Sequence, residues 1–351
     1  MTVSRGETIG IGVIGAGLIS AYHLAGLNAA GGAAVRVLAA RTSARAGPMA
    51  RRFGVPEVTT DWRAVLDRAD IDAVLIATPD STHEEIAVAA AQAGKAILLQ
   101  KPMAMTAGQC RRIIAAARAA GVDLQVSWMH RHFEEVVWAQ ELLASDKLGP
   151  VHHIRIRNAT PGPHEPWFYD RAQVAGGVVM QLGVHGIDLV RHLFGDIETL
   201  TASSATLQPE RRFPSGERVA SDLEDEALAT YRFAGGVLGS HEMSFNEVAG
   251  TDRFRLEIYG ADATLLLRTT RGPLAIFAPR LLGARGWLLP ELPARPFGER
   301  QHARWLDILR KKIPSDRTAE DALAGQMVAE AIYRAADSRR EEQVASTDEG
   351  A

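Results

Sequence analysis

The sequence has almost no cysteine and almost no net charge. Its 351 residues contain a single cysteine, Cys110, which excludes an intrachain disulfide framework and a cysteine-rich metal site. Lys and Arg number 39 against 42 for Asp and Glu, and the resulting charge of −3 provides no general attraction for nucleic acid. No apolar run reaches the roughly 18 residues that a membrane-spanning helix requires, and the early run over 8–20 lacks the cationic lead-in of a secretion signal. We therefore expect a cytoplasmic protein without a nucleic-acid or membrane partner.

The sequence also lacks a recognisable metal-binding motif. It has 11 histidines, but none of them belongs to a His-Glu-x-x-His pattern, and no carboxylate cluster accompanies them. His152 and His153 are neighbours on an expected strand, so their side chains leave opposite faces and cannot share one ligand. We therefore expect no bound metal.

The chain is long enough for two domains of roughly 100–200 residues each, and its apolar fraction of 46% is enough for two full cores. In the first part, short apolar runs alternate with stretches of helical periodicity, which predicts parallel strands joined by crossover helices. The expected strands are 8–14, 35–39, 71–77, 96–99 and 122–126, and the expected helices are 18–29, 42–53, 81–93 and 106–120. The predicted fold class is α/β, with a doubly wound parallel sheet in a first domain, 1–127.

The pattern changes near Trp128. After an expected helix over 134–144, residues 151–158 and 254–258 alternate between apolar and polar side chains, and the runs 227–233 and 237–245 flank Ala234-Gly235-Gly236, a hairpin signal. These features predict a second domain, 128–337, with a mainly antiparallel sheet that is covered on one face. The helices that we expect to cover it are 184–194, 299–311 and 318–336; the segment 273–296 shows no clear period, and 338–351 is a polar tail.

A dinucleotide fingerprint follows the first expected strand. Gly15-Ala16-Gly17-Leu18-Ile19-Ser20 ends that strand and opens a helix, which is the context this motif requires. Gly15 allows the tight turn and Gly17 lets the backbone approach a pyrophosphate, which the helix N-terminus then binds. Ser20 occupies the third small-residue position, where Gly or Ala is usual. We expect Gly15, Gly17, Leu18 and Ile19 to bind the cofactor.

The end of the second strand indicates which dinucleotide is bound. An NAD site normally has Asp or Glu here to accept a hydrogen bond from the ribose 2′-hydroxyl, and the segment 39–43 contains no acid. Arg41 is instead available for a 2′-phosphate, with Thr42 and Ser43 as hydroxyl donors. The alternative is a solvated surface arginine. We predict NADP as the preferred cofactor, with NAD possible.

Two further loops share this edge of the sheet, because ligands of doubly wound sheets bind outside the carboxyl ends of the strands. Thr78-Pro79-Asp80 follows the third strand, and Gln100-Lys101-Pro102 follows the fourth. Lys101 is therefore a candidate acid–base group, since a nearby nicotinamide cation would weaken its hold on a proton. The ordinary alternative is a solvated lysine.

A second constellation lies in the other domain. His185 stands between Gly183 and Gly186 at the start of an expected helix, where small neighbours would let it approach a substrate closely. A lone histidine in an apolar stretch is as often a packed core residue, so the residues alone leave both interpretations open.

Together these motifs resemble the Gfo/Idh/MocA oxidoreductase family over roughly residues 8–335. The resemblance is carried by the fingerprint, by residues 78–83, by Lys101-Pro102 and by residues 183–188. It implies a Rossmann domain followed by an α/β domain with a large open sheet, through which members usually form homodimers or homotetramers. It also implies hydride transfer between NAD(P) and a carbinol carbon of a sugar, polyol or related cyclic substrate. The family's lysine falls on Lys101, often after a cis bond at Pro102, and its histidine on His185.

The resemblance extends to the cofactor and substrate contacts. It places Thr78, Pro79, Asp80, His83 and Gln100 along the nicotinamide pocket, although His83 could equally cap a helix or lie at the surface. A substrate role is expected for Gln181, Arg131, Trp167 and Tyr169. For Arg131 the alternative is a tie between the domains, and for the two aromatic residues it is the anchoring of a proline-rich loop.

The sequence departs from the family twice, at Gln100 and at Gln181, where the family usually has Glu and Asp. Each change removes a negative charge and keeps the hydrogen-bonding shape. Loss of the carboxylates lowers the proton affinity expected for Lys101 and His185. Either one of these two groups acts as a neutral base, or the acid–base chemistry is impaired. The leading hypothesis is an NADP-dependent dehydrogenase or reductase; the alternatives are a non-catalytic dinucleotide sensor and redox-assisted cleavage of a glycoside with a recycled cofactor.

Overall fold

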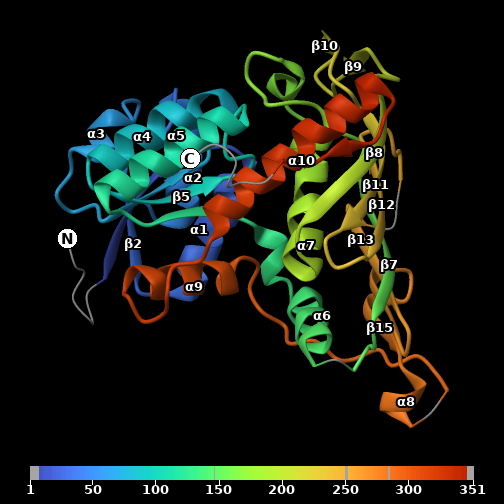
Figure 1. The fold of residues 1–351 in the computed structure, drawn as a ribbon. Helices are drawn as coiled ribbons and strands as arrows, with labels where there is room; N and C mark the ends of the chain where they lie inside the picture. Colours follow the sequence, from blue (N-terminus) through green and yellow to red (C-terminus); the bar gives the residue numbers. More distant parts are fainter. Residues whose placement is uncertain (1–7, 146, 250–251, 284, 346–351) are drawn as a thin grey trace. The chain divides into compact units, whose positions relative to one another are not determined.

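The computed structural model describes residues 8–145, 147–249, 252–283 and 285–345, which form two compact units (Figure 1). The first unit runs to His132 and also contains Ala294–Leu323. The second contains Phe133–Pro293 and the chain from Ala324 onward. Helix α10 (Thr318–Ser338) therefore contributes its first residues to one unit and the rest to the other.

The first unit is built on a parallel sheet of six strands in the order β3-β2-β1-β4-β5-β6. Its central strands are apolar throughout because helices cover both faces, and every residue of β1 is buried. The predicted doubly wound parallel sheet is confirmed. The sequence analysis missed only β3, whose three residues are largely exposed. The strands are β1 (Ile9–Ile14), β2 (Ala33–Ala39), β3 (Glu57–Thr59), β4 (Ala73–Ile76), β5 (Ala96–Gln100) and β6 (Leu124–Ser127).

One helix of the first unit comes from much later in the chain. Trp305 and Leu306 of this helix, α9, are buried in the same apolar core as Ile11 and Leu24. Our expectation that 299–311 covers the second sheet was therefore wrong, because an apolar helix face does not specify which sheet it packs against. The helices are α1 (Leu18–Ala30), α2 (Ser43–Phe53), α3 (Arg63–Leu66), α4 (His83–Gln92), α5 (Ala107–Ala120) and α9 (Glu299–Leu309).

The second unit contains a mixed sheet of eight strands in the order β15-β14-β13-β7-β12-β11-β8-β16. Only the β7–β12 pair within it is parallel, so the predicted mainly antiparallel sheet is confirmed. A separate two-stranded ribbon joins β9 (Glu210–Arg212) and β10 (Arg218–Ala220). The sheet strands are β7 (Val151–Ala159), β8 (Ile197–Ala205), β11 (Glu226–Phe233), β12 (Leu238–Ser244), β13 (Phe254–Gly260), β14 (Thr264–Thr269), β15 (Gly272–Phe277) and β16 (Glu342–Gln343).

Helices cover one face of this sheet (Figure 1). Strand β11 alternates between buried and exposed residues along its length, as a half-covered strand must. The opposite face carries polar side chains such as Arg155, Thr230 and Ser240 around a shallow hollow. The covering helices are α6 (Glu134–Ala144), α7 (Val184–Phe194) and the part of α10 from Ala324 onward; the short α8 (Pro279–Leu282) has no buried residue and lies beyond the end of the sheet (Figure 1).

The structure differs from two predictions, one for the segment 273–296 and one for the C-terminal tail. The segment 273–296, which shows no period, contains most of β15 and all of α8. In the expected polar tail 338–351, Glu342 and Gln343 pair with β8 as an edge strand, and residues 346–351 lie outside the described part of the chain. Among the described residues, no helix combines the length and the apolar character needed to cross a membrane.

Candidate functional site

The fingerprint turn brings three strand ends together. Gly15 follows β1 with φ of +114°, and a Cβ placed on it would lie 2.1 Å from the carbonyl oxygen of Ala77 beyond β4. Its N–H donates to the carbonyl of Ala39 at the end of β2 (2.8 Å). Only glycine combines this backbone angle with so close an approach.

The helix that follows begins with an open end. Gly17 is the N-cap of α1, no side chain caps the helix there, and a Cβ on Gly17 would meet nothing within 4 Å. Leu18 is 78% exposed. A helix N-terminus with accessible N–H groups and free space in front of it fits the pyrophosphate of a dinucleotide.

Ser20 stabilises the turn from inside. Its hydroxyl donates to the carbonyl of Gly15 (2.9 Å), and the side chain is fully buried. This bond explains how a serine is accommodated at the third small-residue position, where Gly or Ala is usual.

We predict that Ser20→Ala keeps the packing of α1 on β1 and loses this hydrogen bond. The expected cost is about 1 kcal/mol of unfolding free energy, together with a few-fold weaker dinucleotide binding, because the Gly15 turn becomes less rigid. Urea denaturation and fluorescence titration with the dinucleotide measure the two effects. An unchanged stability would show that the bond contributes nothing.

The residues that we predict to bind a 2′-phosphate follow directly after β2. Arg41, Thr42 and Ser43 are all exposed, and α2 starts at Ser43 with Thr42 as its N-cap. No side-chain hydrogen bond caps this helix. Its first N–H groups lie in the same short segment as the three polar side chains.

A buried histidine ties together the two loops that carry the other cofactor candidates. His83 has no exposed surface; its Nε2 lies 2.9 Å from the carbonyl oxygen of Thr78, and its Nδ1 lies 3.0 Å from that of Pro102. It is therefore neither a surface group nor a helix cap. Pro79 and the buried Asp80 begin the turn that leads into α4.

Lys101 stands at the carboxyl end of β5, as predicted, and is half-buried. The Lys101–Pro102 bond is cis. The backbone N–H of Lys101 donates to Oε1 of the preceding Gln100 (2.7 Å), whose side chain is 8% exposed. The glutamine at this position thus contacts the lysine's own backbone.

Arg131 forms an ion pair within the first unit. Its Nη1 lies 2.8 Å from Oδ2 of Asp321 in the first turn of α10, and its side chain is 9% exposed. Both partners belong to the first unit, so this contact does not tie the two domains together, and the substrate role of Arg131 stays a prediction. Burial, followed by the neighbouring Arg131, lowers the pKa of His132 to about 3, so that imidazole is neutral.

In the second unit, His185 and Gln181 lie on one continuous helical segment. Gln181 belongs to a π-helical turn, Val179–Gly183, that leads directly into α7, and each side chain is 7% exposed. The predicted helix thus starts one residue before His185, while the π turn preceding it was not predicted. Such turns are frequent at functional sites.

The glycines that flank His185 pack against the sheet, whereas we expected them to leave room for a substrate beside His185. A Cβ on Gly183 would lie 2.3 Å from Sδ of Met243, and a Cβ on Gly186 would lie 2.2 Å from Oδ1 of Asn158. Both positions face the sheet, so they let α7 approach β7 and β12 closely. They do not open space for a substrate.

A buried carboxylate holds the loop before the π turn. Glu224 accepts from the N–H groups of Gly177 and Val179 and from the hydroxyl of Tyr333 on α10 (2.8 Å for the last). Burial raises the pKa of Glu224. These bonds determine where the segment carrying Gln181 starts.

The two aromatic candidates are packed. Tyr169 is 8% exposed, donates to the carbonyl of Pro163 (3.3 Å) and lies beneath the guanidinium of Arg211. Trp167 is half-buried and stacks on Phe168 with ring centroids 3.8 Å apart. The contacts of Tyr169 favour the loop-anchor interpretation, whereas Trp167 keeps an exposed part.

Sequence reasoning missed two buried histidine systems. His23 on α1 and His302 on α9 are hydrogen-bonded to each other (2.9 Å) although 279 positions separate them. His241 on β12 lies between Tyr231 and Asn158 in the same way. The first contact joins helices that only the tertiary fold brings together, whereas His241 and Tyr231 lie on the two strands of the predicted hairpin, and Asn158 comes from β7.

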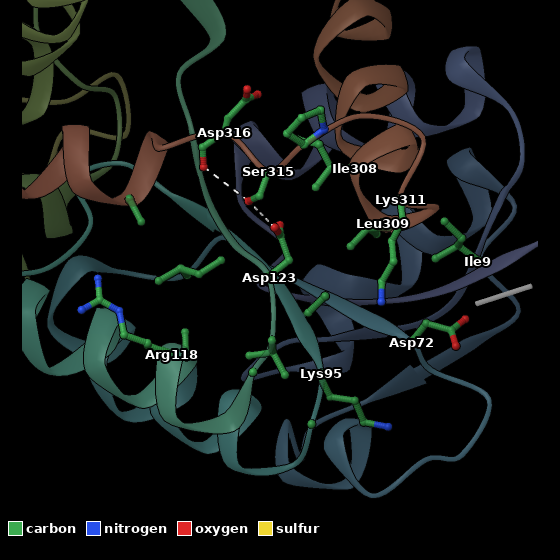
Figure 2. A pocket seen from close by; sticks show the side chains of 18 of the residues that line it. Ile9, Asp72, Lys95, Arg118, Asp123, Ile308, Leu309, Lys311, Ser315 and Asp316 are labelled. Carbon is green, nitrogen blue, oxygen red and sulfur yellow. Dashed lines mark hydrogen bonds between the residues drawn. The ribbon is translucent and has the colours of Figure 1, made fainter. Parts of the chain in front are cut away.

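A hollow of about 1220 Å³ lies at the other edge of the first sheet (Figure 2). Several of its polar groups bond to one another, as the hydroxyl of Ser315 does to the carboxylate of Asp123. Dinucleotides bind at the carboxyl ends of the strands, so this hollow is not where we expect the cofactor. Its lining comes from the amino ends of β1, β4, β5 and β6 and includes Ile9, Asp72, Lys95 and Asp123.

Two family models match most of the chain. Residues 9–128 match the one described as an oxidoreductase family with an NAD-binding Rossmann fold, and residues 136–266 match the one described as the GFO/IDH/MocA C-terminal domain. Levoglucosan dehydrogenase of Pseudarthrobacter phenanthrenivorans is 29% identical over 84% of this chain and 83% of its own length. Inositol 2-dehydrogenase 2 of Saccharopolyspora erythraea is 32% identical over 92% of each chain.

Solved structures show the same architecture. Levoglucosan dehydrogenase in complex with NADH and L-sorbose superposes with a TM-score of 0.84 at 26% identity and covers 96% of this chain and 99% of its own. An oxidoreductase domain protein from Kribbella flavida gives a TM-score of 0.87 at 25% identity and covers 97% and 100%.

Proposed function

This chain belongs to the Gfo/Idh/MocA oxidoreductase family, and from that premise we propose a specific reaction for it. The reaction is hydride transfer between a nicotinamide dinucleotide and a carbinol carbon of a sugar, polyol or related cyclic substrate. The observation that carries the proposal is the carboxyl edge of the first sheet. There the strained Gly15 turn, the open N-terminus of α1 and Lys101 follow strands of one sheet.

The proposed roles follow from the chemistry of the side chains. The dinucleotide, when bound, supplies the hydride acceptor or donor. Gly15, Gly17 and the first N–H groups of α1 bind its pyrophosphate. Lys101 and His185 act as the acid–base groups that take up or return the hydroxyl proton, and Gln181 orients that hydroxyl.

The loss of two carboxylates relative to the family suits this assignment. With glutamine at 100 and 181, neutral amides stand where carboxylates would favour the protonated forms of Lys101 and His185. A neutral lysine or imidazole is the form that can accept a proton from a substrate hydroxyl.

A substrate panel tests the proposal directly. Nicotinamide absorbance is followed with inositols, levoglucosan and L-sorbose, each with both cofactors, because the names of the relatives given above refer to such compounds. We expect turnover with at least one cyclic polyol or anhydrosugar. Tight dinucleotide binding without turnover on any of them would instead favour the sensor hypothesis, and release of an aglycone without net cofactor reduction would favour glycoside cleavage.

We further propose that Arg41 recognises a 2′-phosphate, with Thr42 and Ser43 as hydroxyl donors. The residues after β2 contain no acid, and all three side chains are exposed. Solved relatives of the family hold NADH, so both cofactors must be measured.

Arg41→Ala is expected to weaken NADP binding by about tenfold while leaving NAD binding within a few-fold, because a charged hydrogen bond of about 1.5–3 kcal/mol is lost for the phosphate alone. Arg52→Ala, at the far end of the same helix, is the matched control. An NADP-to-NAD affinity ratio that does not change in Arg41→Ala would refute the cofactor preference.

The open face of the second sheet is the proposed oligomerisation surface. Its outward side chains, such as Arg155 and Glu257, surround the shallow hollow described above. We propose a homodimer or homotetramer assembled through this face. Light scattering of the purified protein gives the oligomeric state, and a monomer at micromolar concentration would overturn the proposal.

A further inference from the structure

The side chain of Gln100 ends a row of hydrogen bonds that runs away from Lys101 into the first unit. Its Nε2 lies 3.2 Å from Nε2 of His23, whose Nδ1 lies 2.9 Å from Nε2 of His302. Nδ1 of His302 lies 2.7 Å from the carbonyl oxygen of Gly298. The row therefore contains three hydrogen bonds and connects β5, α1 and α9.

Counting protons determines the direction of every bond. The carbonyl of Gly298 can only accept, so His302 donates from Nδ1 and accepts at Nε2. His23 must then donate from Nδ1 and accept at Nε2, where the amide of Gln100 donates. Two neutral imidazoles supply one proton each, and the amide supplies the third.

The other end of the amide is determined as well. The N–H of Lys101 donates to Oε1 of Gln100 (2.7 Å), which places the oxygen there and the nitrogen toward His23. A glutamate at position 100 could accept from Lys101 but has no proton for His23. The neutral rings of His23 and His302 would then supply only two protons for three hydrogen bonds. One of the three bonds would be lost, whichever ring nitrogens carried the protons.

The surroundings keep both rings neutral. Burial, together with His302, lowers the pKa of His23 well below its usual value, and burial lowers the pKa of His302 to about 4. Tyr22 packs edge-on against His23 and is neutral because burial raises its pKa. The pKa of His132, on which His302 acts electrostatically, is lowered mainly by burial, so this ring is also neutral.

The fold makes room for this row. A Cβ on Gly26 of α1 would lie 2.3 Å from Nδ1 of His302, so only glycine leaves space for the ring. Gly298 has φ of +88° at the N-cap of α9, which presents its carbonyl to the ring. The charged groups that act electrostatically on His132 are Arg131, Arg304 and Asp316.

We propose that Gln100 is a positioning residue for Lys101: the row of His302 and His23 requires an amide at this position to complete its three hydrogen bonds, and these bonds fix the side chain that accepts from the lysine's backbone N–H. This inference rests on the proposed role of Lys101 as an acid–base group. Exchange of Gln100 for the glutamate that the family usually has would therefore make activity depend on one additional proton.

The test compares Gln100→Glu with the native enzyme between pH 6 and 9. At pH 8 we expect kcat to fall by about tenfold or more, since a small displacement of a catalytic group has effects of this size. Because a protonated glutamate, or a protonated His23 beside a carboxylate, restores the third proton, kcat should recover as the pH falls. A kcat and pH profile equal to those of the native enzyme would overturn the proposal.

The matched control is Gln125→Glu on the neighbouring strand β6. Gln125 is 4% exposed and its amide donates to Ser315 and to the carbonyl of Asp316, with no histidine in contact. This variant buries the same new carboxyl group. We expect it to lower stability and to leave the shape of the pH profile unchanged.

A second measurement separates this inference from the proposed function and does not require the variant to fold. Long-range ¹H–¹⁵N spectra of histidine-labelled native protein report the tautomer of each ring, with assignments from His23→Gln and His302→Gln. We expect both rings to be neutral with the proton on Nδ1. A proton on Nε2 of either ring would refute the row of hydrogen bonds. If both rings carry the proton on Nδ1 but Lys101→Met keeps full turnover, only the proposed role of the lysine is refuted.

Discussion

Lys101→Met is expected to lower kcat by about 10²- to 10⁴-fold, the range typical for removal of a general acid or base. Methionine has nearly the length of lysine and carries no proton, so the loss reports the chemistry and not the volume of the side chain. Dinucleotide binding should stay within a few-fold of the native value, because the fingerprint turn around Gly15 and Ser20 is untouched. Stopped-flow measurement of hydride transfer checks the expectation.

The matched control is Lys95→Met, which removes the same charge from the opposite end of the same strand. Nζ of Lys95 donates to the carbonyls of Arg68 and Ile71 at 2.7 and 2.8 Å, so this variant should lose stability. Its kcat should equal that of the native enzyme. Equal effects of the two replacements on kcat would mean that Lys101 acts only through net charge or stability, and turnover that survives Lys101→Met would remove it from the mechanism.

The second large effect is expected for the packing of α7. In Gly186→Ala the new Cβ would lie 2.2 Å from Oδ1 of Asn158 and 2.8 Å from the ring of His241. The helix must move or the Asn158–His241 bond must break, at a cost of about 2–4 kcal/mol. Because His185 is the preceding residue, we also expect kcat to fall by more than the loss of folded protein explains. Urea denaturation and active-site titration measure the two effects.

Gly325→Ala is the control for this replacement in the same unit. A Cβ there would lie 4.0 Å from the side chain of Ile187, which is an ordinary contact. Alanine in a helix is favoured over glycine by about 0.5–1 kcal/mol, so this variant should be equally or more stable than the native protein. If both replacements were tolerated equally, the close approach of α7 to the sheet would not be a constraint.

Much of the fold could be predicted from local patterns. The continuous apolar run at Ile9–Ile14 predicts a buried parallel strand because helices cover both faces of such a sheet, and the alternation along Val151–Ala159 predicts a strand with one covered face. Residues 134–144 and 184–194 have helical periodicity that matches α6 and α7 residue for residue. Each of these signals lies within the element that it predicts.

Three elements were not predicted or were placed on the wrong sheet. The apolar face of α9 predicts a helix but not its partner, and the structure packs it into the first unit. Strand β15 lies in a segment whose Pro and Gly content obscured its period, and β16 has only two residues. The contacts that place α9 and β16 join residues that are distant in the chain, so no window of sequence contains them, whereas β15 pairs with the adjacent strand β14 and was missed because of its composition.

In the candidate site too, some features follow from local motifs and others only from the tertiary structure. Short motifs and the rule that ligands of such sheets bind at carboxyl ends were sufficient to indicate the glycine turn and the strand-end lysine as candidates, whereas for the histidine of α7 the residues alone left two interpretations open. Only the tertiary structure decided what surrounds them: that Gly186 faces the sheet, that His83 joins two loops, and that Gln100 meets His23. The physical reason is that motifs act through local backbone geometry, whereas hydrogen-bond direction and burial depend on partners outside the motif, such as His23, which lies 77 positions from Gln100.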